Sequence, residues 1–566
     1  MTVVAGVDIG NATTEVVVAR LDGNALVPVA WDRTMTRGGK GSQSSVDGAA
    51  ALLRRLERQG VPSPTVVALA PLRPVGTEAL VLPEPPLDTG RLVLAASGVP
   101  TAGGAGHGVG RPVMLADLAG SGASLNDTDT IVLVPSDIGY RDVASAVTSA
   151  LEAGVPLRGV VLAGDEAVLV ANRLPTELPV VDQADVGALQ LCRKVIVEVR
   201  PAGQPVRAAS DALHLTSSLH LGPPDATAVA VVCRSLFDVS NAVVGVREEP
   251  APPAASMPSA WVELSDGASL PMSEAHPLLR EGPPGLAHRV GLPAASGDRV
   301  LEVDDLGTVH LGAVADVVVS RSGSTVSRSY ALSALHRDPV VVAAEHLHEA
   351  TGVPVVTVDS EAASSRRGAL TTPGATADCA VVDLGGGTVD VTTIDGETVV
   401  AGAGDLLTVS TAAVLGLPRG AAEWVKRVPC HRVETPHLLV GEDGSRTFVD
   451  GRLPGDHVGS LVVPGPAGWL AFDRSLAAAE WRALRLALKR EVLGGAVRRA
   501  LRACGPLPST VVLVGGPAGD DEAVATVARV LPAQTAVGRG DVAGALGHRY
   551  AVAYGLALGA TAHHSA

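Results

Sequence analysis

Two short glycine-bearing segments, far apart in the chain, carry residues suited to phosphate chemistry. The first is Asp8-Ile-Gly10-Asn11-Ala12-Thr13, and the second is Asp383-Leu-Gly385-Gly386-Gly387-Thr388. Each combines an apolar strand, an aspartate, a turn of small residues and a returning strand. Backbone N–H groups in such a turn point at an anion, and glycine lets the backbone approach it closely. Two turns that face each other would clamp a phosphate chain from both sides.

The aspartates at the start of these turns are the candidate catalytic carboxylates. Asp8 and Asp383 are expected to hold Mg²⁺ through water, as hard-cation sites commonly do. Asn11 and Thr13 are expected to donate hydrogen bonds to phosphate oxygens. An aspartate is also a common way to start a tight turn, so either segment alone would leave that simpler interpretation open. Their occurrence as a pair favours a nucleotide site.

A third glycine turn follows an apolar stretch near the carboxyl end of the chain. Val511–Val514 is predicted to be a strand, and it ends in Gly515-Gly516-Pro517-Ala518. A Gly-Gly pair at a strand end allows a flat adenine or ribose to lie against the backbone. The motif is weak alone, but as the third member in this order it predicts the adenosine side of the site.

The elements that position these turns must come from both ends of the chain, so the nucleotide domain is predicted to be discontinuous. A Pro- and Ala-rich stretch at 248–258 is predicted to be a linker. The expected division is a first nucleotide-domain part at 1–90, an inserted α/β domain at 91–250, a linker and insert region at 251–335, and a second nucleotide-domain part at 336–566.

Composition narrows the class of protein. The chain has 566 residues, more than a single hydrophobic core organises. Its net charge of −15 argues against nucleic acid as a partner, because phosphate-backbone binding needs a basic face. The five cysteines form no CxxC pair, which favours reduced thiols. With no signal-peptide pattern and no apolar run of about 18 residues, we expect a cytoplasmic protein that does not enter membranes.

The three turns, in this order, resemble the phosphate and adenosine motifs of the actin, heat-shock-70 and sugar-kinase superfamily of ATPases. The resemblance implies an α/β fold with an actin-like (ribonuclease-H-like) ATPase domain. Further segments resemble one subfamily more closely, the large subunit of the diol dehydratase and glycerol dehydratase reactivating factors. Those segments are Thr101–Gly110, Val170-Ala-Asn-Arg-Leu174, Leu370-Thr-Thr-Pro-Gly374, Ala401-Gly-Ala-Gly-Asp405 and Gly538-Arg-Gly540. The resemblance spans almost the whole chain and is weakest at about 190–340.

The subfamily implies a chaperone-like mechanism. Its members pair a large with a small subunit and bind a dehydratase whose adenosylcobalamin has been damaged. They release that cobalamin, with ATP binding and hydrolysis as a conformational switch. The expected ligands are therefore ATP or ADP and Mg²⁺, and the expected assembly is a hetero-oligomer with the small subunit and the dehydratase.

The resemblance also implies functions for particular residues. Thr101, Asp165 and Asp182 match a divalent-metal site in the inserted domain, which the subfamily describes as swivelling. Glu361 matches an acidic residue that would position the attacking water, although a solvated glutamate at a helix start is a simpler interpretation. Lys489, in a long helical stretch, could face the adenosine or only solvent.

Departures from the subfamily leave alternatives open. Ala12 replaces a usual serine, and Pro517-Ala518 replaces usual hydroxyl residues, so side-chain hydrogen bonds to nucleotide are lost there. Gly39-Lys40-Gly41 is not a P-loop, because the first glycine and the Ser/Thr are absent. The alternatives are a reactivase for a related cobalamin lyase, an actin-fold small-molecule kinase, and a scaffold that binds nucleotide without hydrolysing it.

Overall fold

The chain forms two compact units in the computed structural model. Unit 1 holds residues 1–84, 258–318 and 326–566, and unit 2 holds residues 85–257 and 319–325. The described residues are 2–23, 25–71, 78–83, 89–99, 101–118, 128–201, 204–237, 239–250, 260–292, 299–316, 329–337 and 343–564. The predicted linker at 248–258 lies mostly outside them. The four-part division expected from the sequence stays a prediction, since these units group the residues in two.

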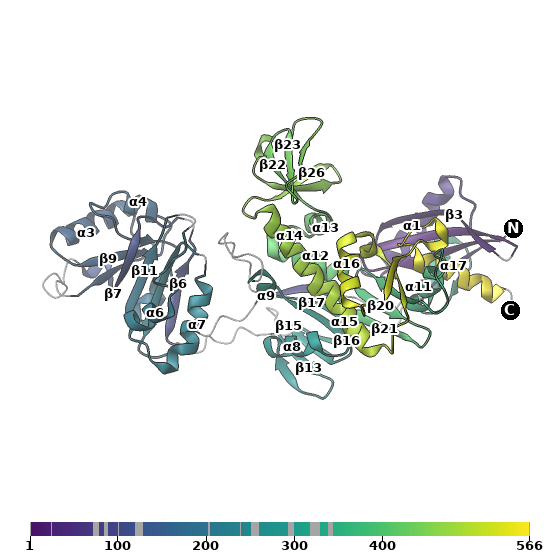
Figure 1. The fold of residues 1–566 in the computed structure, drawn as a ribbon, viewed down its shortest axis with the longest axis horizontal. Helices are drawn as coiled ribbons and strands as arrows, with labels where there is room; N and C mark the ends of the chain where they lie inside the picture. Colours follow the sequence, from purple (N-terminus) through teal and green to yellow (C-terminus); the bar gives the residue numbers. More distant parts are fainter. Residues whose placement is uncertain are drawn as a thin grey trace. The chain divides into compact units, whose positions relative to one another are not determined.

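Unit 1 contains two five-stranded sheets built on one plan (Figure 1). In each, the central strand begins an antiparallel meander on one side, and on the other side it pairs parallel with a strand that in turn pairs parallel with an edge strand. The first sheet has the order β18 (Val355–Thr357), β4 (Val66–Leu69), β1 (Val3–Ile9), β2 (Thr13–Asp22) and β3 (Ala25–Met35). The second has the order β21 (Glu397–Ala401), β20 (Thr388–Thr392), β19 (Ala380–Leu384), β27 (Thr510–Val514) and β28 (Ala536–Arg539).

Helices cover both sheets because the strands are apolar on both faces. Helices α1 (Gln43–Arg58) and α10 (Ala343–Thr351) share a core with one face of the first sheet. Helix α17 (Ala551–His564) shares a core with the other face and with part of the second sheet. Helices α15 (Gly495–Ala503) and α16 (Asp521–Val530) share the core of the second sheet.

Helices α11 (Glu361–Ala369) and α17 pack with almost no side chain between them. A Cβ added at Gly368 would lie 1.9 Å from the Ala551 carbonyl oxygen, and one added at Gly555 would lie 1.8 Å from the Ser364 carbonyl oxygen. Gly6 of β1 approaches the Ala553 carbonyl in the same way, at 1.8 Å. These small residues allow helix, helix and strand to meet backbone on backbone.

A six-stranded antiparallel sheet forms another part of unit 1, where the sequence predicted only an insert. Its order is β14 (Ser269–Pro271), β13 (Trp261–Leu264), β15 (Ala287–Leu292), β16 (Arg299–His310), β17 (Ser329–His336) and β5 (Glu78–Pro83). Helices α8 (Met272–Glu281) and α9 (Leu311–Asp316) accompany it. Strand β5 precedes unit 2 in the chain, so this sheet contains residues from both sides of the insertion.

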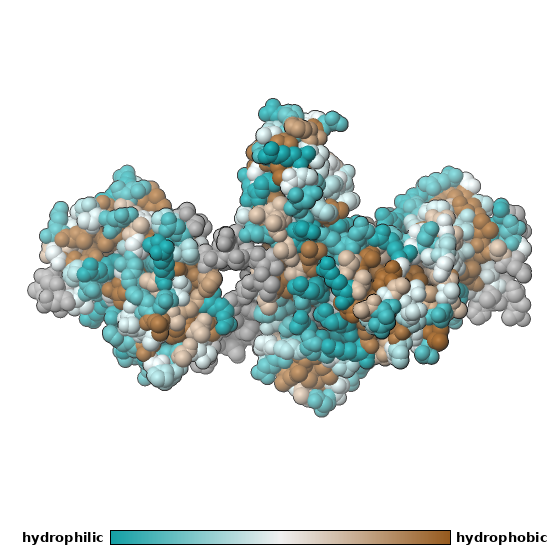
Figure 2. Space-filling view, viewed as in Figure 1, coloured by the Kyte–Doolittle hydropathy of each residue, from teal (hydrophilic) through white to brown (hydrophobic). Residues whose placement is uncertain are grey.

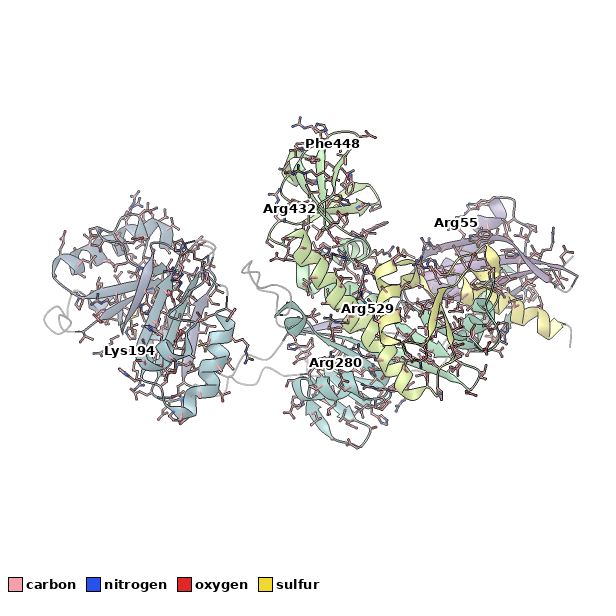
Figure 3. All side chains as sticks on the ribbon, viewed as in Figure 1. Arg55, Lys194, Arg280, Arg432, Phe448 and Arg529 are labelled. Carbon is pink, nitrogen blue, oxygen red and sulfur yellow. The ribbon has the colours of Figure 1, made fainter. Side chains whose placement is uncertain are left out.

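A small antiparallel sheet lies within the second nucleotide-domain part, and the sequence analysis did not distinguish it. Its order is β24 (Arg446–Phe448), β23 (Leu438–Gly441), β22 (His431–Thr435), β25 (Leu461–Gly465) and β26 (Gly468–Asp473). Its core has few buried side chains, and Phe448 projects from it with 78% of its surface exposed (Figure 3). It follows α12 (Gly404–Leu415) and α13 (Arg419–Val425) and precedes α14 (Ala478–Lys489), which continues through a π-helical turn at Arg490–Gly494 into α15.

Unit 2 is a mixed α/β domain with a seven-stranded sheet. The order is β10 (Val180–Val181), β9 (Leu157–Leu162), β8 (Thr130–Val134), β7 (Gly106–Met114), β11 (Cys192–Val199), β12 (Asn241–Arg247) and β6 (Leu92–Ser97). Its described helices are α3 (Tyr140–Glu152), α4 (Ala167–Ala171), α5 (Val186–Gln190), α6 (Ala212–Leu219) and α7 (Ala226–Ser235). The first four strands run parallel and the last four antiparallel, so β7 belongs to both parts.

The surface and the cysteines agree with a folded, aliphatic-cored protein. On the face shown in Figure 2, apolar surface occurs in separated groups despite a positive mean hydropathy of 0.30. All five cysteines are free thiols. Among the residues that the structure describes, no helix combines the length and apolar character needed to span a bilayer.

Candidate nucleotide site

The two predicted phosphate turns are matched hairpins. In the first, the Gly10 amide donates to the Thr13 carbonyl at 3.0 Å; in the second, the Gly385 amide donates to the Thr388 carbonyl at 2.9 Å. Each turn therefore closes with the same hydrogen bond and leaves its remaining N–H groups at the tip. The two hairpins therefore match each other residue by residue, as the two sheets that contain them match strand by strand.

Each hairpin also places an acid opposite its aspartate. Asp8 pairs across the strands with Glu15, and Asp383 pairs with Asp390. The turn motifs in the sequence indicated the aspartates but not these partners. Asp390 lies two residues beyond the second turn, where strand alternation returns its side chain to the face of Thr388.

The tips of the two hairpins meet. A Cβ at Gly386 would lie 3.0 Å from the Ala12 Cβ and 3.2 Å from the Ala12 amide nitrogen. The small side chain of Ala12 therefore faces the opposite glycine turn. Thr36 holds the first turn in place, since its hydroxyl donates to the Gly10 carbonyl at 2.7 Å and its amide donates to the Ala12 carbonyl at 3.1 Å.

A large cavity of about 2190 Å³ opens around these turns, entirely within unit 1. Pockets for small molecules are commonly about 300–1,000 Å³, so this one has room for a nucleotide with its hydrated cation. Its lining includes, among the predicted residues, Asp8, Asn11, Ala12, Thr13, Glu361, Asp383, Gly385, Gly386, Gly387, Thr388, Gly515, Gly516 and Pro517.

Burial shifts the pKa values of the carboxylates in this cavity. Burial raises the pKa of Asp8 well above its usual value, and the charges of Glu361 and Glu15 raise it further. Burial raises the pKa of Asp383 to about 6, although the Ser365 hydroxyl, which donates to it at 2.6 Å, acts in the opposite direction. A bound cation would stabilise the ionised form of both aspartates.

Lys40 is the main cation that the sequence analysis missed. It follows β3 and forms an ion pair with Glu361, the first residue of α11, and its side chain is only 6% exposed. Burial lowers the Lys40 pKa, but the charges of Glu361 and Asp8 outweigh that effect and raise it above its usual value. Lys40 therefore stays charged beside the carboxylates. The only signal in the sequence was a lysine flanked by glycines.

The third glycine turn lies directly against the second hairpin. Gly515 has φ +88°, and an added Cβ would lie 2.3 Å from the Asp383 Oδ1, so only glycine fits there. Strand β27 runs parallel to β19, which aligns Val514 with Asp383. Pro517 lines the cavity, whereas the side chain of Ala518 is fully buried in the core of the second sheet.

A second group of charged residues lies next to the third glycine turn. Arg549 Nη1 is 3.1 Å from the Cβ position of Gly516, and it also lies 3.4 Å from the Glu15 Oε1. Burial raises the Glu15 pKa to about 7, against the opposing effect of Arg549. Burial, together with Arg549, lowers the pKa of His548 to about 4. A neutral histidine and a partly exposed arginine thus lie beside the predicted adenosine side.

The chain contains four lysines, and three of them are buried in unit 1. The side chains of Lys40, Lys426 and Lys489 are 6%, 9% and 0% exposed. Lys489 does not line the cavity; its ammonium group makes ion pairs of 2.5 Å with Asp520 and 2.7 Å with Glu522. Through these two ion pairs, Lys489 holds the segment that follows the third glycine turn.

The three predicted metal ligands of unit 2 lie together. The Thr101 hydroxyl is 2.9 Å from the Asp165 Oδ1 and 3.0 Å from the Asp182 Oδ1. Asp182 is fully buried and accepts from the Ala167 amide at 3.0 Å, while Asp165 is exposed. Three oxygen donors of this kind suit a hard divalent cation. Within the described residues, no group of three or more His, Cys, Asp or Glu side chains is arranged for a metal ion.

The structure thus brings the predicted residues into two places. The phosphate and adenosine residues other than Ala518 line one cavity of unit 1, and Thr101, Asp165 and Asp182 meet in unit 2. Their functions as ligands stay predictions. Local sequence patterns did not indicate five further residues, of which Glu15 and Asp390 lie within the two hairpins and Lys40, Ser365 and Arg549 lie outside them.

Two family models match this chain. Residues 300–560 match the diol dehydratase reactivase ATPase-like domain, and residues 97–249 match the swiveling domain of the diol dehydratase-reactivating factor. The chain belongs to the diol dehydratase reactivase family. The recognition made from the sequence motifs is confirmed, and so is the actin-like α/β fold with an inserted swivelling domain.

Other members of the reactivase family match the chain from end to end. It is 29% identical to the diol dehydratase-reactivating factor large subunit of Klebsiella michiganensis and 28% identical to the propanediol dehydratase-reactivating factor large subunit of Salmonella typhimurium. Each match covers 99% of this chain and 98% of the relative.

Two solved structures are similar over the same length. A glycerol dehydratase reactivase superposes with a TM-score of 0.70 at 25% identity, covering 99% of this chain and all of that chain. A diol dehydratase-reactivating factor in nucleotide-free form superposes with a TM-score of 0.68 at 26% identity, covering both chains completely.

Proposed function

We propose that this chain is the ATP-hydrolysing large subunit of a factor that reactivates a cobalamin-dependent diol or glycerol dehydratase. The observation that carries the proposal is the cavity of unit 1, in which two matched aspartate hairpins and a third glycine turn meet around Lys40 and Glu361. End-to-end similarity to proteins named as reactivating-factor large subunits supports the choice of client.

Phosphate binding is assigned to the two hairpin tips. Backbone N–H groups of residues 11–13 and 386–388 would cradle the phosphate oxygens from opposite sides. Asp8 and Asp383 would hold Mg²⁺ through water and through the bound phosphates, since Mg²⁺ usually keeps several waters and takes one or two carboxylates. Gly515, Gly516 and Pro517 would lie against the adenosine.

Hydrolysis is assigned to the charged residues between the hairpins. Lys40 would neutralise charge that develops on the transferred phosphoryl group, because a desolvated cation is effective in that position. Glu361, held by its ion pair with Lys40, would orient the attacking water. Positioning and electrostatic stabilisation account for most of catalysis in this class of reaction.

The proposed use of ATP is a shift between two conformations. A nucleotide changes such an equilibrium only as far as it binds the two conformations with different affinity. In the proposed cycle, ATP and ADP favour different states for partner binding, and the damaged cobalamin leaves the dehydratase in one of them. The large subunit would act with a small subunit as a hetero-oligomer in the cytoplasm, and Thr101, Asp165 and Asp182 would bind a divalent cation in unit 2.

The decisive experiment measures reactivation. The chain, with its candidate small subunit, is added to a diol dehydratase stalled with cyanocobalamin, together with adenosylcobalamin, Mg²⁺ and ATP. ATP-dependent recovery of aldehyde formation is expected for the wild-type chain and for Asp22→Asn, which changes an exposed carboxylate at the end of β2. Asp8→Asn is expected to remove it.

Other outcomes would point elsewhere. ATP hydrolysis without recovery would contradict this client and favour a reactivase for a different cobalamin lyase. Phosphorylation of an added polyol would identify a kinase. Nucleotide binding with neither recovery nor phosphate release would identify a scaffold.

A further inference from the structure

A buried ion pair joins the six-stranded sheet to the segment that supports the second phosphate turn. Asp305 of β16 is 1% exposed, Arg499 of α15 is 4% exposed, and the two form an ion pair. Neither residue lines the cavity. Burying two charges costs free energy, because both lose their hydration. The other hydrogen bonds of Asp305 and Arg499 therefore show what compensates for this cost.

Asp305 accepts hydrogen bonds from α15, from β21 and from the loop between α8 and β15. Its Oδ1 accepts from Arg499 and from the Gly285 amide at 3.0 Å. Its Oδ2 accepts from the Ala401 amide at 2.8 Å. The strand is bulged between Val303 and Asp305, and such bulges re-aim a side chain. The carboxylate therefore fixes the last residue of β21 relative to β16 and α15.

The Ala401 end of β21 leads directly to the phosphate turn. Ala401 pairs with Thr388 across β20 and β21. The next residues then bond to the turn itself: the Gly402 amide donates to the Gly387 carbonyl at 2.9 Å, and the Asp405 amide donates to the Gly386 carbonyl at 2.7 Å. If Ala401 is displaced, the amides of Gly402 and Asp405 must move with it, and these amides bond to the carbonyls of the two turn glycines.

Strand β16 also touches this segment through its backbone. A Cβ at Gly307 would lie 2.4 Å from the Ala401 carbonyl oxygen and 3.4 Å from the Gly402 Cα. Figure 1 shows β16, β21 and α15 side by side, in agreement with these contacts. The contact is therefore rigid, since no flexible side chain lies between the two backbones.

Two other ion pairs join α8 to the helix that contains Arg499, but they are more exposed. Arg280 lies 2.9 Å from Glu491, and Arg502 lies 2.8 Å from Glu281 (Figure 3 labels Arg280). Exposed pairs contribute little because water and salt screen them. Of these three ion pairs, Asp305–Arg499 is the most shielded from water. It therefore has the greatest effect on how α15 and β16 are held together.

The six-stranded sheet contains the chain connections to unit 2. Unit 2 begins after β5 and returns before β13. A displacement of β16 is therefore transmitted through this sheet to β5 and β13, the strands next to the chain connections with unit 2. We propose that Asp305 and Arg499 are positioning residues that couple nucleotide occupancy of the second phosphate turn to this sheet.

The inference rests on the proposed nucleotide binding, and its test uses the full-length chain. Asp305→Asn keeps the shape of the side chain, but an amide cannot accept from all three donors at once. Loss of one charge-assisted hydrogen bond is expected to weaken ADP binding with Mg²⁺ about tenfold, measured by calorimetry. Glu263→Gln, which removes a partly exposed ion pair with Arg289 from the same sheet, should leave the affinity unchanged.

Hydrogen exchange supplies the readout that a purely structural role would not change. In the wild-type chain, saturating ADP with Mg²⁺ should slow amide exchange both in 380–392 and in 301–310. In Asp305→Asn, saturating ADP should still slow exchange in 380–392 but no longer in 301–310. Arg499→Lys, a milder change, should give the same pattern with a smaller loss, and it serves if Asp305→Asn does not fold.

The outcomes separate the inference from the proposed function. Wild-type affinity in Asp305→Asn, or unchanged slowing in 301–310, would overturn the coupling while leaving nucleotide binding intact. Absence of ADP binding by the wild-type chain would overturn both.

Discussion

At the scale of single residues, the ion pair of Lys40 with Glu361 shows what a sequence pattern leaves out, because the resemblance indicated Glu361 but not its lysine partner. The two residues are 321 positions apart and form an ion pair in the cavity. Asp8 and Asp383 were predicted as catalytic because each starts a glycine turn with a local pattern. No local pattern identifies a lysine whose importance comes from burial beside distant carboxylates, and burial is a property of the fold.

Replacement of Lys40 by methionine tests its function. The ammonium group is the buried cation that opposes the charges of Glu361 and Asp8. Its loss should reduce the rate of ATP hydrolysis by about 10²–10³-fold, the usual effect of removing one preorganised electrostatic group, with the thermal transition retained. Steady-state phosphate release measures the effect, and Lys194→Met in unit 2 is the control. Wild-type turnover in Lys40→Met would remove Lys40 from the mechanism.

The Asp383 pKa of about 6 predicts a pH dependence. A folded-state pKa above the ordinary aspartate value means that this group contributes stability below about pH 4, which is lost as pH rises through about 6. Binding of ADP with Mg²⁺ needs the ionised form, so affinity should rise over about pH 5–7, while the contribution of Asp383 to the stability of the free chain falls. Calorimetric titrations and thermal melts across this range measure both.

Ser365 gives a sharper version of the same test. Its hydroxyl donates to Asp383 at 2.6 Å and stabilises the carboxylate. Ser365→Ala should move the midpoint of the affinity profile to higher pH. The adjacent Ser364 is also buried, but its hydroxyl has no hydrogen-bond partner within the described residues, so Ser364→Ala should leave the midpoint in place. Equal midpoints in the two variants would contradict the assigned cause.

At the scale of elements, the contact between α11 and α17 depends on glycine. Gly555→Ala would place a methyl group 1.8 Å from the Ser364 carbonyl oxygen, so the helices must separate. Overpacking of this kind typically costs about 1–3 kcal/mol. Chemical denaturation should show a loss of that order for Gly555→Ala. Gly495→Ala, where the added Cβ has only an arginine side-chain end at 3.8 Å, should be neutral or stabilising. Equal stability in both variants would contradict the close packing.

The elements around the glycine turns were accessible from sequence because their strands are apolar and their turns have defined residue types. The small sheet of β22–β26 was not. Its strands are short, and β24 is exposed at all three residues, so no alternating pattern marks it. Strand β5 could not be assigned either, because its partner β17 lies about 250 positions later, beyond an inserted domain.

At the scale of the whole molecule, unit 2 has cores of its own. Three clusters of buried side chains lie within residues 92–246, and the seven-stranded sheet is complete there. A fragment of residues 89–250 should therefore unfold in one cooperative transition. With Mg²⁺ present throughout, added ADP should not shift that transition, whereas it should raise a transition of the full chain, because a ligand stabilises only the unit that binds it. Differential scanning calorimetry measures both, and a nucleotide-induced shift in the fragment would contradict the assignment of the site to unit 1.

The distribution of lysines has a practical consequence for bioconjugation. Three of the four are enclosed in unit 1, while Lys194 in unit 2 is only half-buried. An amine-reactive fluorophore should therefore attach to unit 2 at one side chain, in addition to any free α-amino group, without engineered cysteines. Fluorescence anisotropy of a dye at Lys194 would then report the rotational freedom of unit 2 in each nucleotide state of the native sequence.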